Sequence, residues 1–404
     1  MVVRLGGARY EQGMRWWEAF YRQLGCDVKV LVNAISARIG GIVTYTGNLA
    51  RSLEQRQVDA TIAVSARFPG TNANLWRHWA SDLRPLARFL WEQTGWRQTV
   101  ARLKPDVLFS SANFGLLSCP VPQVLLVREG GLFDPFYLAN CSPAQGVKAA
   151  IQREARRRLI IASARRADRV VAPTAAMRDL LLSWAPDLEG KMIVNPYGTI
   201  SDSFSPAEGQ ARSWRGDGRL KLLYVSVYYP HKQPGLVCRT VDHLLADGID
   251  THATITMDLA ETEDFRGGKL DRRLMEAALA KGTLSLGRQP YNALPDLYRQ
   301  HDVFVFPSLS ETFGHPMVEA LSSGLPVVVG DTPVNREVCG DAALYFDPLS
   351  PSSLADCVRR LDSSPELRAD LAARGRQRVV RSFTWDTHVA RLVEVFRDLA
   401  GQRP

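Results

Sequence analysis

The stretch SLSETFGHPMVEALSSGLPVVV (308–329) predicts a turn, a helix and a strand that follow an earlier strand. That earlier strand is DVFVFPS (302–308), a β-branched and aromatic run typical of a buried sheet. Pro316 fits the first turn of a helix, because the N–H that proline lacks would have no intrahelical partner there. Gly324 fits the end of the helix, and PVVVG (326–330) then resumes the sheet. The order strand, helix, strand indicates a parallel βαβ unit.

Two carboxylates stand on either side of the predicted helix start. Glu311 would lie on the loop after the first strand, and Glu319 about one turn into the helix. Both would face a crevice lined by the free backbone N–H groups of the helix start, which suits a ligand with hydroxyls and a phosphate. The same pattern arises when an acid is favoured near a helix N-terminus by the macrodipole alone. The local pattern leaves both interpretations open.

The composition is that of an ordinary globular protein. With 404 residues, of which 46% are hydrophobic and 23% charged, two domains are expected. There is no uninterrupted apolar run of about 18 residues, and the first residues lack the apolar core of a secretory signal. A cytoplasmic location is therefore expected. The six cysteines are scattered without a C-x-x-C pair, so neither a disulfide nor a structural metal is expected. The net charge of +8 favours anionic partners without choosing among them.

Short apolar runs alternate with helical patterns along the whole chain. Six runs precede a polar stretch at 201–219 and six follow it: 29–35, 60–66, 106–111, 123–129, 169–174 and 191–196, then 221–227, 252–258, 283–287, 302–308, 326–331 and 343–347. Such runs separated by helices are typical of parallel sheets buried on both faces. The sequence therefore predicts an α/β protein with two doubly wound Rossmann-like domains, and a ligand cleft between them.

The predicted domain boundaries follow from this series. We expect an N-terminal extension (1–28), an N-terminal domain (29–200), a linker (201–218), a C-terminal domain (219–382) and a last helix (383–404). The last helix is amphipathic and is expected to pack back on the N-terminal domain. The extension contains RWWEAFYRQLG, which is either a surface helix that docks on a membrane or on the protein, or a simple upstream segment.

With these features, the chain resembles the retaining glycosyltransferases of family 4, also called glycosyl transferases group 1, whose two-domain architecture is GT-B. The resemblance covers nearly all of residues 28–395. Its most specific part is residues 308–348, with the Glu-x7-Glu block and the strand and acidic segment after it. VLVNAISARIGGIVTYTGNLA (30–50) resembles the family's first strand and glycine pair. Weaker matches are ADRVVAPTAAMRDLL (167–181), VNPYGT (194–199) and SFTW (382–385).

The resemblance implies a nucleotide-sugar donor in the C-terminal domain and an acceptor in the N-terminal domain. It implies that Glu319 binds the ribose hydroxyls and that Glu311 lies near the donor sugar. Backbone groups of the segment Phe313, Gly314, His315 and Pro316 would line the donor. A carboxylate and N–H donors suit the positive sugar and negative phosphate that form when the donor bond breaks.

Two further positions are implied to contact the diphosphate. Gly40 and Gly41 would let the backbone approach it, although a tight strand-to-helix turn also favours glycine. Lys232 matches a lysine that the family places on the donor phosphates, and otherwise it is a solvated loop lysine. No Asp-x-Asp metal signature occurs, so the resemblance implies catalysis without a metal or other cofactor.

The chain departs from the family at two places. Ser226 and Val227 stand where many members carry a phosphate-binding arginine, and Arg38 or Arg288 would substitute for it. Arg128 and Glu129 stand where many members carry a histidine near the acceptor. Glu129 would either accept a proton from the attacking hydroxyl or pair with Arg128. Glu337, in contrast, matches the family's acidic residue after the donor strand. It would hold Lys232 or the phosphate loop, or cap a turn.

The expected reaction is transfer of a sugar, with retained anomeric configuration, from a UDP- or GDP-linked donor to a hydroxyl of a glycan, a lipid-linked or a small-molecule acceptor. By analogy this fits polysaccharide biosynthesis at the inner face of the membrane.

The tryptophan-rich segment 74–96 is either core or an acceptor or lipid contact, and the basic run 148–169 is either a solvated face or a membrane contact. No nucleic-acid module is found. An epimerase of the same fold and a non-catalytic nucleotide-sugar-binding protein are the alternatives; a phosphorylase would need a pyridoxal lysine, and a dehydrogenase a Gly-x-Gly-x-x-Gly motif that is absent.

Overall fold

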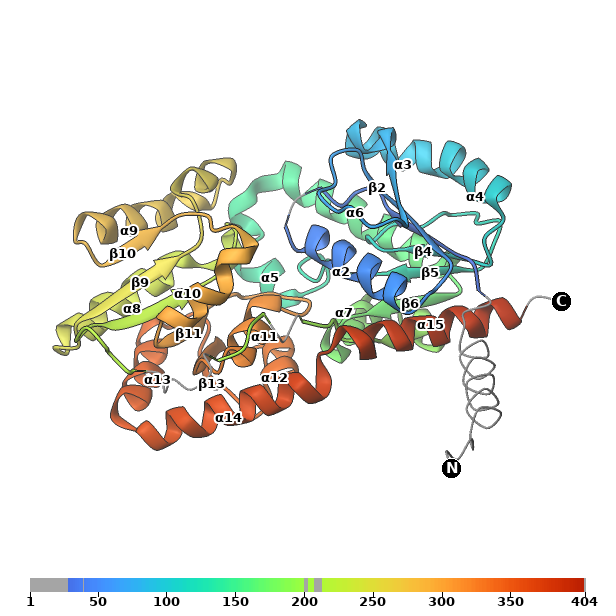
Figure 1. The fold of residues 1–404 in the computed structure, drawn as a ribbon. Helices are drawn as coiled ribbons and strands as arrows, with labels where there is room; N and C mark the ends of the chain where they lie inside the picture. The colour runs from blue at the N-terminus through green and yellow to red at the C-terminus, as the bar shows by residue number, and fades with distance from the viewer. Residues whose placement is uncertain (1–27, 39, 200–202, 207–212, 403–404) are drawn as a thin grey trace, which may run out of the picture. The chain divides into compact units, whose positions relative to one another are not determined.

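The computed structural model describes residues 28–38, 40–199, 203–206 and 213–402. Almost all of the predicted N-terminal extension, residues 1–27, and much of the predicted linker lie outside the described residues. The chain forms two compact units. Among the described residues, the first comprises those within 28–125, 166–168 and 389–402, and the second comprises those within 126–165 and 169–388. Figure 1 labels most of the helices and many of the strands of both.

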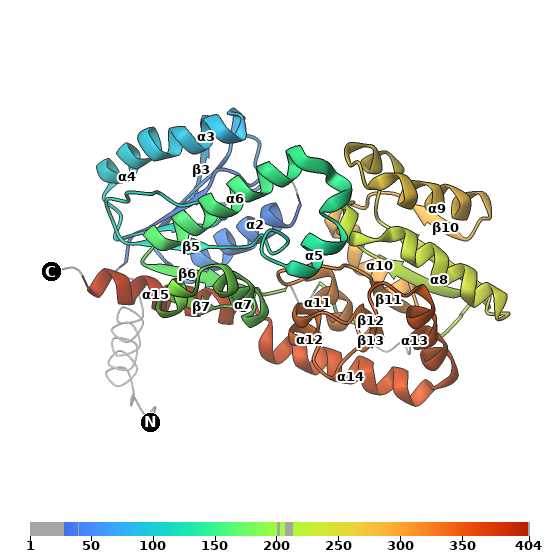
Figure 2. The ribbon, with the colours of Figure 1, turned by 180° about the vertical axis from the view of Figure 1, so that it is seen from behind.

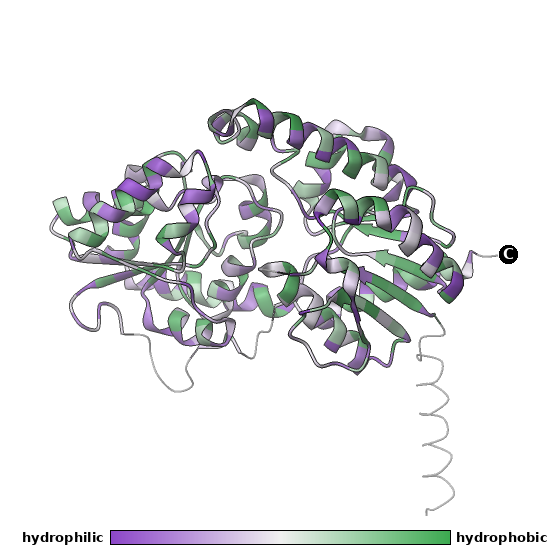
Figure 3. Ribbon diagram, turned by 90° about the horizontal axis from the view of Figure 1, so that it is seen from above, coloured by the Kyte–Doolittle hydropathy of each residue, from purple (hydrophilic) through white to green (hydrophobic). Residues whose placement is uncertain are grey.

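The first sheet has seven strands in the order β3-β2-β1-β4-β5-β6-β7. Their bounds are β1 Val30–Ala34, β2 Ala60–Ser65, β3 Leu75–His78, β4 Val107–Ser110, β5 Gln123–Leu126, β6 Arg169–Ala172 and β7 Met192–Val194. The strands pair in parallel, for example Val30 with Ala60 and with Val107. β1, β4 and β5 are buried along their whole length, and Figure 3 shows the strands of this sheet predominantly in the hydrophobic colour. The unit boundary crosses this sheet, because β6 and β7 belong to the second unit.

The second sheet has six strands in the order β10-β9-β8-β11-β12-β13. Their bounds are β8 Leu220–Tyr224, β9 Thr251–Ile255, β10 Leu284–Leu286, β11 Val303–Phe306, β12 Val327–Gly330 and β13 Leu344–Phe346. All five pairs of neighbouring strands in this sheet are parallel, with β8 and β11 at the centre. In both sheets the chain starts at a central strand and winds outward to each edge, so the prediction of two parallel Rossmann-like α/β domains is confirmed.

All twelve predicted strand runs form strands, and among the described residues one further strand was not predicted. β3 lies inside the tryptophan-rich segment, pairs with β2 and forms the edge of the first sheet.

Helices connect the strands. In the first half they are α2 Gly41–Gln55, α3 Pro85–Trp91, α4 Arg97–Leu103, α5 Pro135–Asn140, α6 Gly146–Arg166 and α7 Ala175–Trp184. In the second half they are α8 Pro234–Ala246, α9 Gly268–Ala280, α10 Leu294–Gln300, α11 His315–Ser322, α12 Pro333–Cys339, α13 Pro351–Ser363, α14 Pro365–Ser382 and α15 Trp385–Gly401. Figure 2 shows α8 beside α13 in the second unit. In the part of the chain that the structure describes, no helix has the length and apolar character needed to cross a bilayer.

The last helix carries the predicted apolar face. Its residues Val389, Leu392, Val393 and Phe396 are all buried. Within the first unit, the ring of Phe396 packs on Phe109 of β4, with 5.6 Å between ring centroids. This contact adds the end of the chain to the core around the first sheet.

Candidate active site

The centre of the candidate site is a buried ion pair between Lys232 and Glu311. Lys232 ends the 3-10 turn Pro230–Lys232 after β8, and Glu311 lies on the loop after β11. The Lys232 ammonium contacts the Glu311 carboxylate, and the two side chains are only 12% and 13% exposed. The Lys232 Nζ also lies 5.5 Å from the ring centroid of Phe306. The two residues expected to act on the donor phosphate and on the donor sugar are therefore in direct contact.

Hydrogen bonds from the Gln233 side chain and from one backbone N–H hold the lysine turn against the loop after β11. Gln233 adopts the left-handed conformation, with φ of +48°, and its Nε2 donates to the carbonyls of Pro307 (3.0 Å) and Pro348 (2.9 Å). The N–H of Leu309 donates to the carbonyl of His231 at 2.9 Å. These hydrogen bonds position the backbone at Lys232 without involving the Lys232 side chain.

Glu319 has an environment quite unlike that of Glu311. It is 4% exposed, and it accepts hydrogen bonds from the hydroxyls of Tyr298 (3.0 Å) and Tyr291 (3.3 Å). Burial raises the pKa of Glu319 to about 7, and the two hydrogen bonds oppose that rise. One glutamate is paired with a cation, and the other is held by neutral phenols.

The segment from Phe313 to Pro316 forms the start of α11. Gly314 has a φ of +78°, a conformation that favours glycine, and it precedes the first helical residue. Phe313 is buried, and the His315 ring stacks on Tyr197 at 5.2 Å. Burial, helped by the nearby Arg128, lowers the pKa of His315 to about 3, so this imidazole is neutral. Its Nε2 is buried and has no hydrogen-bond partner among the residues described.

Loops after β5 and β6 lie directly on the loop that carries Glu311. A Cβ added to Gly130 would lie 3.1 Å from the carbonyl oxygen of Glu311, so only glycine fits there without a shift. The Thr174 hydroxyl donates to the carbonyl of Thr312 at 2.9 Å. All of these residues belong to the second unit. Residues from both halves of the sequence therefore surround Glu311.

Glu129 and Glu337 have partners that the sequence did not predict. The two carboxylate oxygens of Glu129 share the single N–H of the Arg156 Nε, at 2.8 and 2.7 Å. Arg128 lies over the Tyr197 ring, 5.6 Å from its centroid. Glu337 accepts the N–H groups of the first two residues of α7, at 2.7 and 2.8 Å. Of the roles considered for Glu337, the structure shows a capping role: the carboxylate caps the N-terminus of helix α7.

The two arginines expected to replace the missing family arginine are engaged elsewhere. Arg288 donates to Glu261 at 2.7 Å and lies 3.5 Å from Asp258. Arg38 donates to the carbonyl of Ser81 at 3.2 Å. A phosphate contact from either side chain stays a prediction.

Gly40 and Gly41 belong to the first unit. Gly40 has φ +73° and ψ −158°, which is essentially a glycine conformation, whereas Gly41 begins α2 without positive φ. A Cβ added to either would meet no described atom within 4 Å. The backbone is thus open to a close approach, as a phosphate contact requires.

No group of three or more His, Cys, Asp or Glu side chains within the described ranges is arranged to hold a metal ion. The sequence analysis missed Tyr291, Tyr298 and Tyr197. Tyr298 sits in a predicted helix at a buried position, which was the one available signal, whereas nothing local marked Tyr291 as a partner of Glu319.

Two parallel Rossmann-like sheets, with polar side chains at the strand ends of the second sheet, are typical of α/β enzymes that bind nucleotides. Two family models match the chain. The model described as "Glycosyltransferase Family 4" matches residues 39–198, and the model described as "Glycosyl transferases group 1" matches residues 210–378. The chain therefore belongs to glycosyltransferase family 4, as the resemblance predicted.

Similar proteins agree with this family and fold. The D-inositol 3-phosphate glycosyltransferase of Geodermatophilus obscurus is 28% identical over 246 residues, which are 58% of this chain and 54% of that protein. The chain spans about half the length of the curated relatives it matches. Sucrose-phosphate synthase from Thermosynechococcus elongatus has a TM-score of 0.75 at 16% identity, with 93% of this chain and 100% of that chain covered. Anabaena Alr3699/HepE in complex with UDP-glucose has a TM-score of 0.72 at 15% identity, with 92% and 100% covered. These structures share the GT-B fold.

Proposed function

We propose that the chain transfers a sugar from a UDP- or GDP-linked donor to a hydroxyl of an acceptor, with retained anomeric configuration and without a metal ion. The observation that carries this proposal is the buried Lys232–Glu311 pair, where the loop after β11 leads into α11. Burial matters because charges act more strongly where water is excluded.

The Lys232–Glu311 pair would stabilise both charges that form during transfer of the sugar. When the bond between the sugar and the diphosphate breaks, the sugar becomes oxocarbenium-like and the diphosphate gains negative charge. The Glu311 carboxylate would face the positive sugar, and the Lys232 ammonium, together with backbone N–H groups at the start of α11, would face the phosphate. The donor would then share Lys232 with Glu311, its partner in the free protein.

The acceptor proton needs no protein base in this scheme. The bond from the anomeric carbon to the phosphate oxygen breaks, the bond to the acceptor oxygen forms on the same face, and the acceptor proton passes to the departing phosphate oxygen. Glu129 is a poor alternative base, because its carboxylate oxygens are already hydrogen-bonded to the Arg156 guanidinium.

Glu319 and the glycine pair would hold the rest of the nucleotide. Ribose hydroxyls would replace the Tyr291 hydroxyl on Glu319, because Tyr291 is partly exposed whereas Tyr298 is fully buried. Gly40 and Gly41 would admit the diphosphate to the backbone.

The identities of the donor nucleotide and of the acceptor are proposed from the similar proteins and from the family. UDP is favoured as the donor nucleotide, because Alr3699/HepE shares the fold and its structure holds UDP-glucose. The acceptor would be a glycan, a lipid-linked or a small-molecule hydroxyl compound, used in polysaccharide biosynthesis at the cytoplasmic face of a membrane, and nucleic acid is not an expected partner. The epimerase and binding-protein alternatives are not favoured, because the relatives are named as glycosyltransferases.

Calorimetry with UDP- and GDP-sugars in metal-free buffer tests the donor site. We expect one nucleotide to bind, with a loss of at least about tenfold in affinity for Lys232→Met, since a charge-assisted contact contributes about 1.5–3 kcal/mol. Arg336→Met is the matched control, because that exposed arginine pairs with Asp331 after β12. Nuclear magnetic resonance of the product would then give the anomeric configuration. No binding of any nucleotide sugar, or equal binding by Lys232→Met, would overturn the proposal.

A further inference from the structure

Three large apolar side chains are exposed within a stretch of twelve residues of the first unit, from Trp79 to Leu90. Trp79 is 60% exposed, and Leu86 and Leu90 are 68% and 58% exposed. Trp79 begins the 3-10 turn Trp79–Asp82, and the leucines lie four residues apart on one face of α3. Trp91, also on α3, contacts Trp79 with 5.4 Å between ring centroids and so joins the turn to the helix. We call Trp79, Leu86 and Leu90 the α3 surface. Single exposed apolar residues are ordinary, whereas a group of them marks an interaction site.

The α3 surface rests on a firmly packed aromatic base. Trp96 is fully buried in the core of the first unit, and Trp76 and Trp91 pack against that core. The His78 ring lies 4.9 Å from Trp91, and its Nδ1 accepts the N–H of Ala80 at 3.1 Å. Three of the four tryptophans of the segment, Trp76, Trp91 and Trp96, therefore lie in or against the core, as one of its two interpretations predicted. Trp79 is the member that faces solvent, because its neighbours already fill the interior.

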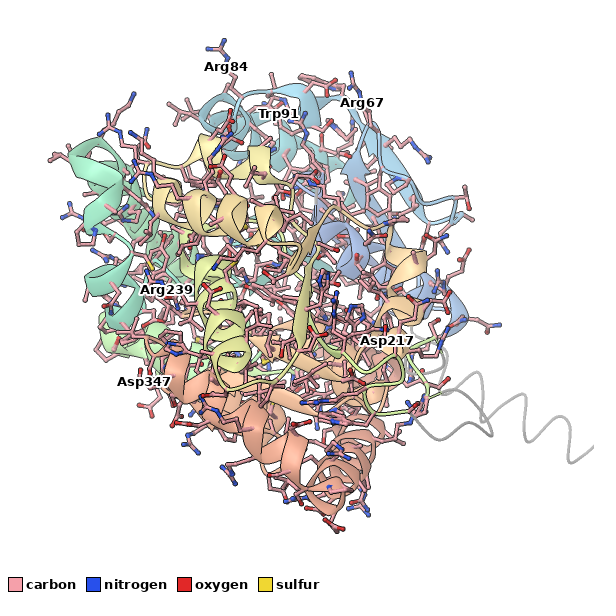
Figure 4. The ribbon with its side chains drawn as sticks, turned by 90° about the vertical axis from the view of Figure 1, so that its left-hand side faces the viewer. Arg67, Arg84, Trp91, Asp217, Arg239 and Asp347 are labelled. Atoms are coloured by element: carbon pink, nitrogen blue, oxygen red, sulfur yellow. The ribbon has the colours of Figure 1, made fainter. Side chains whose placement is uncertain are left out.

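The surroundings of the α3 surface are strongly basic. Residues 66–104 contain seven Arg or Lys and two acids, Asp82 and Glu92, which leaves a net charge of +5. The exposed cations are Arg67, Arg77, Arg84, Arg97, Arg102 and Lys104. Figure 4 shows the side chains of Arg67 and Arg84 projecting away from the body of the protein. Of the acids, Asp82 is exposed, whereas Glu92 is buried beside Arg88. The exposed charge is therefore nearly all positive.

We propose that the α3 surface docks on the anionic headgroups of a lipid bilayer, with Trp79, Leu86 and Leu90 entering the interface and the surrounding arginines binding lipid phosphates. A tryptophan beside leucines and exposed arginines suits the boundary between acyl chains and headgroups. Each Lys or Arg near an anionic surface adds attraction, which salt screens. The proposal deepens the proposed function, since docking would bring the enzyme to a lipid-linked acceptor, but the docking needs no donor and is measured without one.

A second exposed apolar pair provides a matched control. Val147 and Ile151 on α6 are 77% and 65% exposed, which is similar to the exposure of the α3 surface. This pair lacks an aromatic side chain, and arginines of α6 are already paired, for example Arg157 and Arg158 with Glu154. If any exposed apolar pair promoted binding to vesicles, Val147→Ser/Ile151→Ser would weaken it as strongly as changes in α3.

Co-sedimentation of the full chain with vesicles tests the proposal. We expect binding to vesicles of phosphatidylglycerol and phosphatidylcholine, weaker binding to phosphatidylcholine alone, and a fall as salt rises. Trp79→Ser/Leu86→Ser/Leu90→Ser should lower the partition constant by at least about tenfold, since burying each such side chain contributes about 1.5–3 kcal/mol. Arg67→Gln/Arg84→Gln should lower it several-fold and reduce its salt dependence. The α6 control should bind as the wild type does.

Two further measurements separate docking from folding and from catalysis. An unchanged affinity of the triple variant for the nucleotide sugar would show that it is folded. In vesicles of brominated lipid, Trp79→Phe should keep its binding but lose part of the tryptophan quenching. Wild-type binding by the triple variant, equal loss in the α6 control, or equal binding to neutral vesicles would overturn the proposal. So would a dimer that the triple variant abolishes in the absence of vesicle binding, since the α3 surface would then bind a second copy of the chain. None of these outcomes bears on donor binding.

Discussion

Glu319 should make the free protein less stable as the pH rises, and Glu319→Gln should remove that cost. Burial raises the pKa of this carboxyl group from its ordinary value of 4.5 to about 7. Between these two values the folded state binds more protons than the unfolded state, so the free energy of unfolding falls as pH rises. The stability is fully present below pH 4.5 and is lost up to about pH 7. A difference of about 2.5 pKa units at about 1.36 kcal/mol each gives about 3 kcal/mol.

The glutamine variant keeps the shape of the side chain without the buried charge. Its amide can still accept a hydrogen bond from one of the two tyrosine hydroxyls and donate to the other. We therefore expect Glu319→Gln to be more stable than the wild type by about 3 kcal/mol at pH 8, and by less than about 1 kcal/mol at pH 5. Urea unfolding followed by tryptophan fluorescence at both pH values measures the difference. Tyr298→Phe is the opposite control, because it removes a donor from the carboxylate and should lower stability at pH 8.

The same substitution should weaken binding of the nucleotide sugar, because an amide accepts fewer ribose hydroxyls than a carboxylate. Greater stability together with weaker binding is the signature of a residue kept for function at a cost to folding. A stability gain of equal size at pH 5 and pH 8 would refute the account of the buried charge. A pH-dependent gain with unchanged donor affinity would refute the ribose role alone.

Four other predictions concern the rest of the site. Gly40→Ala should cost about 1–3 kcal/mol, because its φ of +73° strains any other residue, whereas Gly41→Ala should keep the melting temperature but weaken donor binding if the diphosphate lies there; equal effects of the two would contradict this. Lys232→Met should destabilise the chain by leaving Glu311 buried without its cation, and adding Glu311→Gln should recover stability in urea unfolding; a double variant no better than the single one would argue against a coupled pair. Glu337→Ala should cost about 1–2 kcal/mol through the lost cap while donor affinity in calorimetry stays the same, and a large affinity change would give Glu337 a binding role. Dialysis against a chelator should leave the transfer rate unchanged, and a loss that Mg²⁺ restores would exclude the metal-free mechanism.

The strands could be predicted well, because burial on both faces of a parallel sheet leaves a clear apolar run in the sequence. β3 was missed for the opposite reason. Leu75–His78 is a four-residue edge strand with two partly buried residues and one exposed, so it lacks the continuous apolar run by which the other strands were predicted. At an edge, pairing with β2 decides the structure, and such pairing has no local signature.

The candidate site was predicted residue by residue, but its pairings were not. Lys232 and Glu311 were named separately, and nothing in a chain separation of 79 residues indicates that they form an ion pair. The same holds for Arg156 with Glu129 and for Glu337 at the start of α7, because each contact joins elements that are distant in the sequence.

The cap that Glu337 places on α7 bears on how the enzyme could be recombined with its relatives. Together with the bond from Thr174 to the Thr312 carbonyl, it ties residues after β6 to the second sheet. An exchange of halves at the linker would separate these partners and leave two N–H groups of α7 to whatever acidic residue the new half supplies. A chimera that takes residues 126–388 as one piece, with the unit-1 residues 166–168 carried along inside it, would keep both sets of contacts. A chimera designed to keep the donor specificity of this chain should therefore include β6 and β7 of the first sheet together with the second sheet.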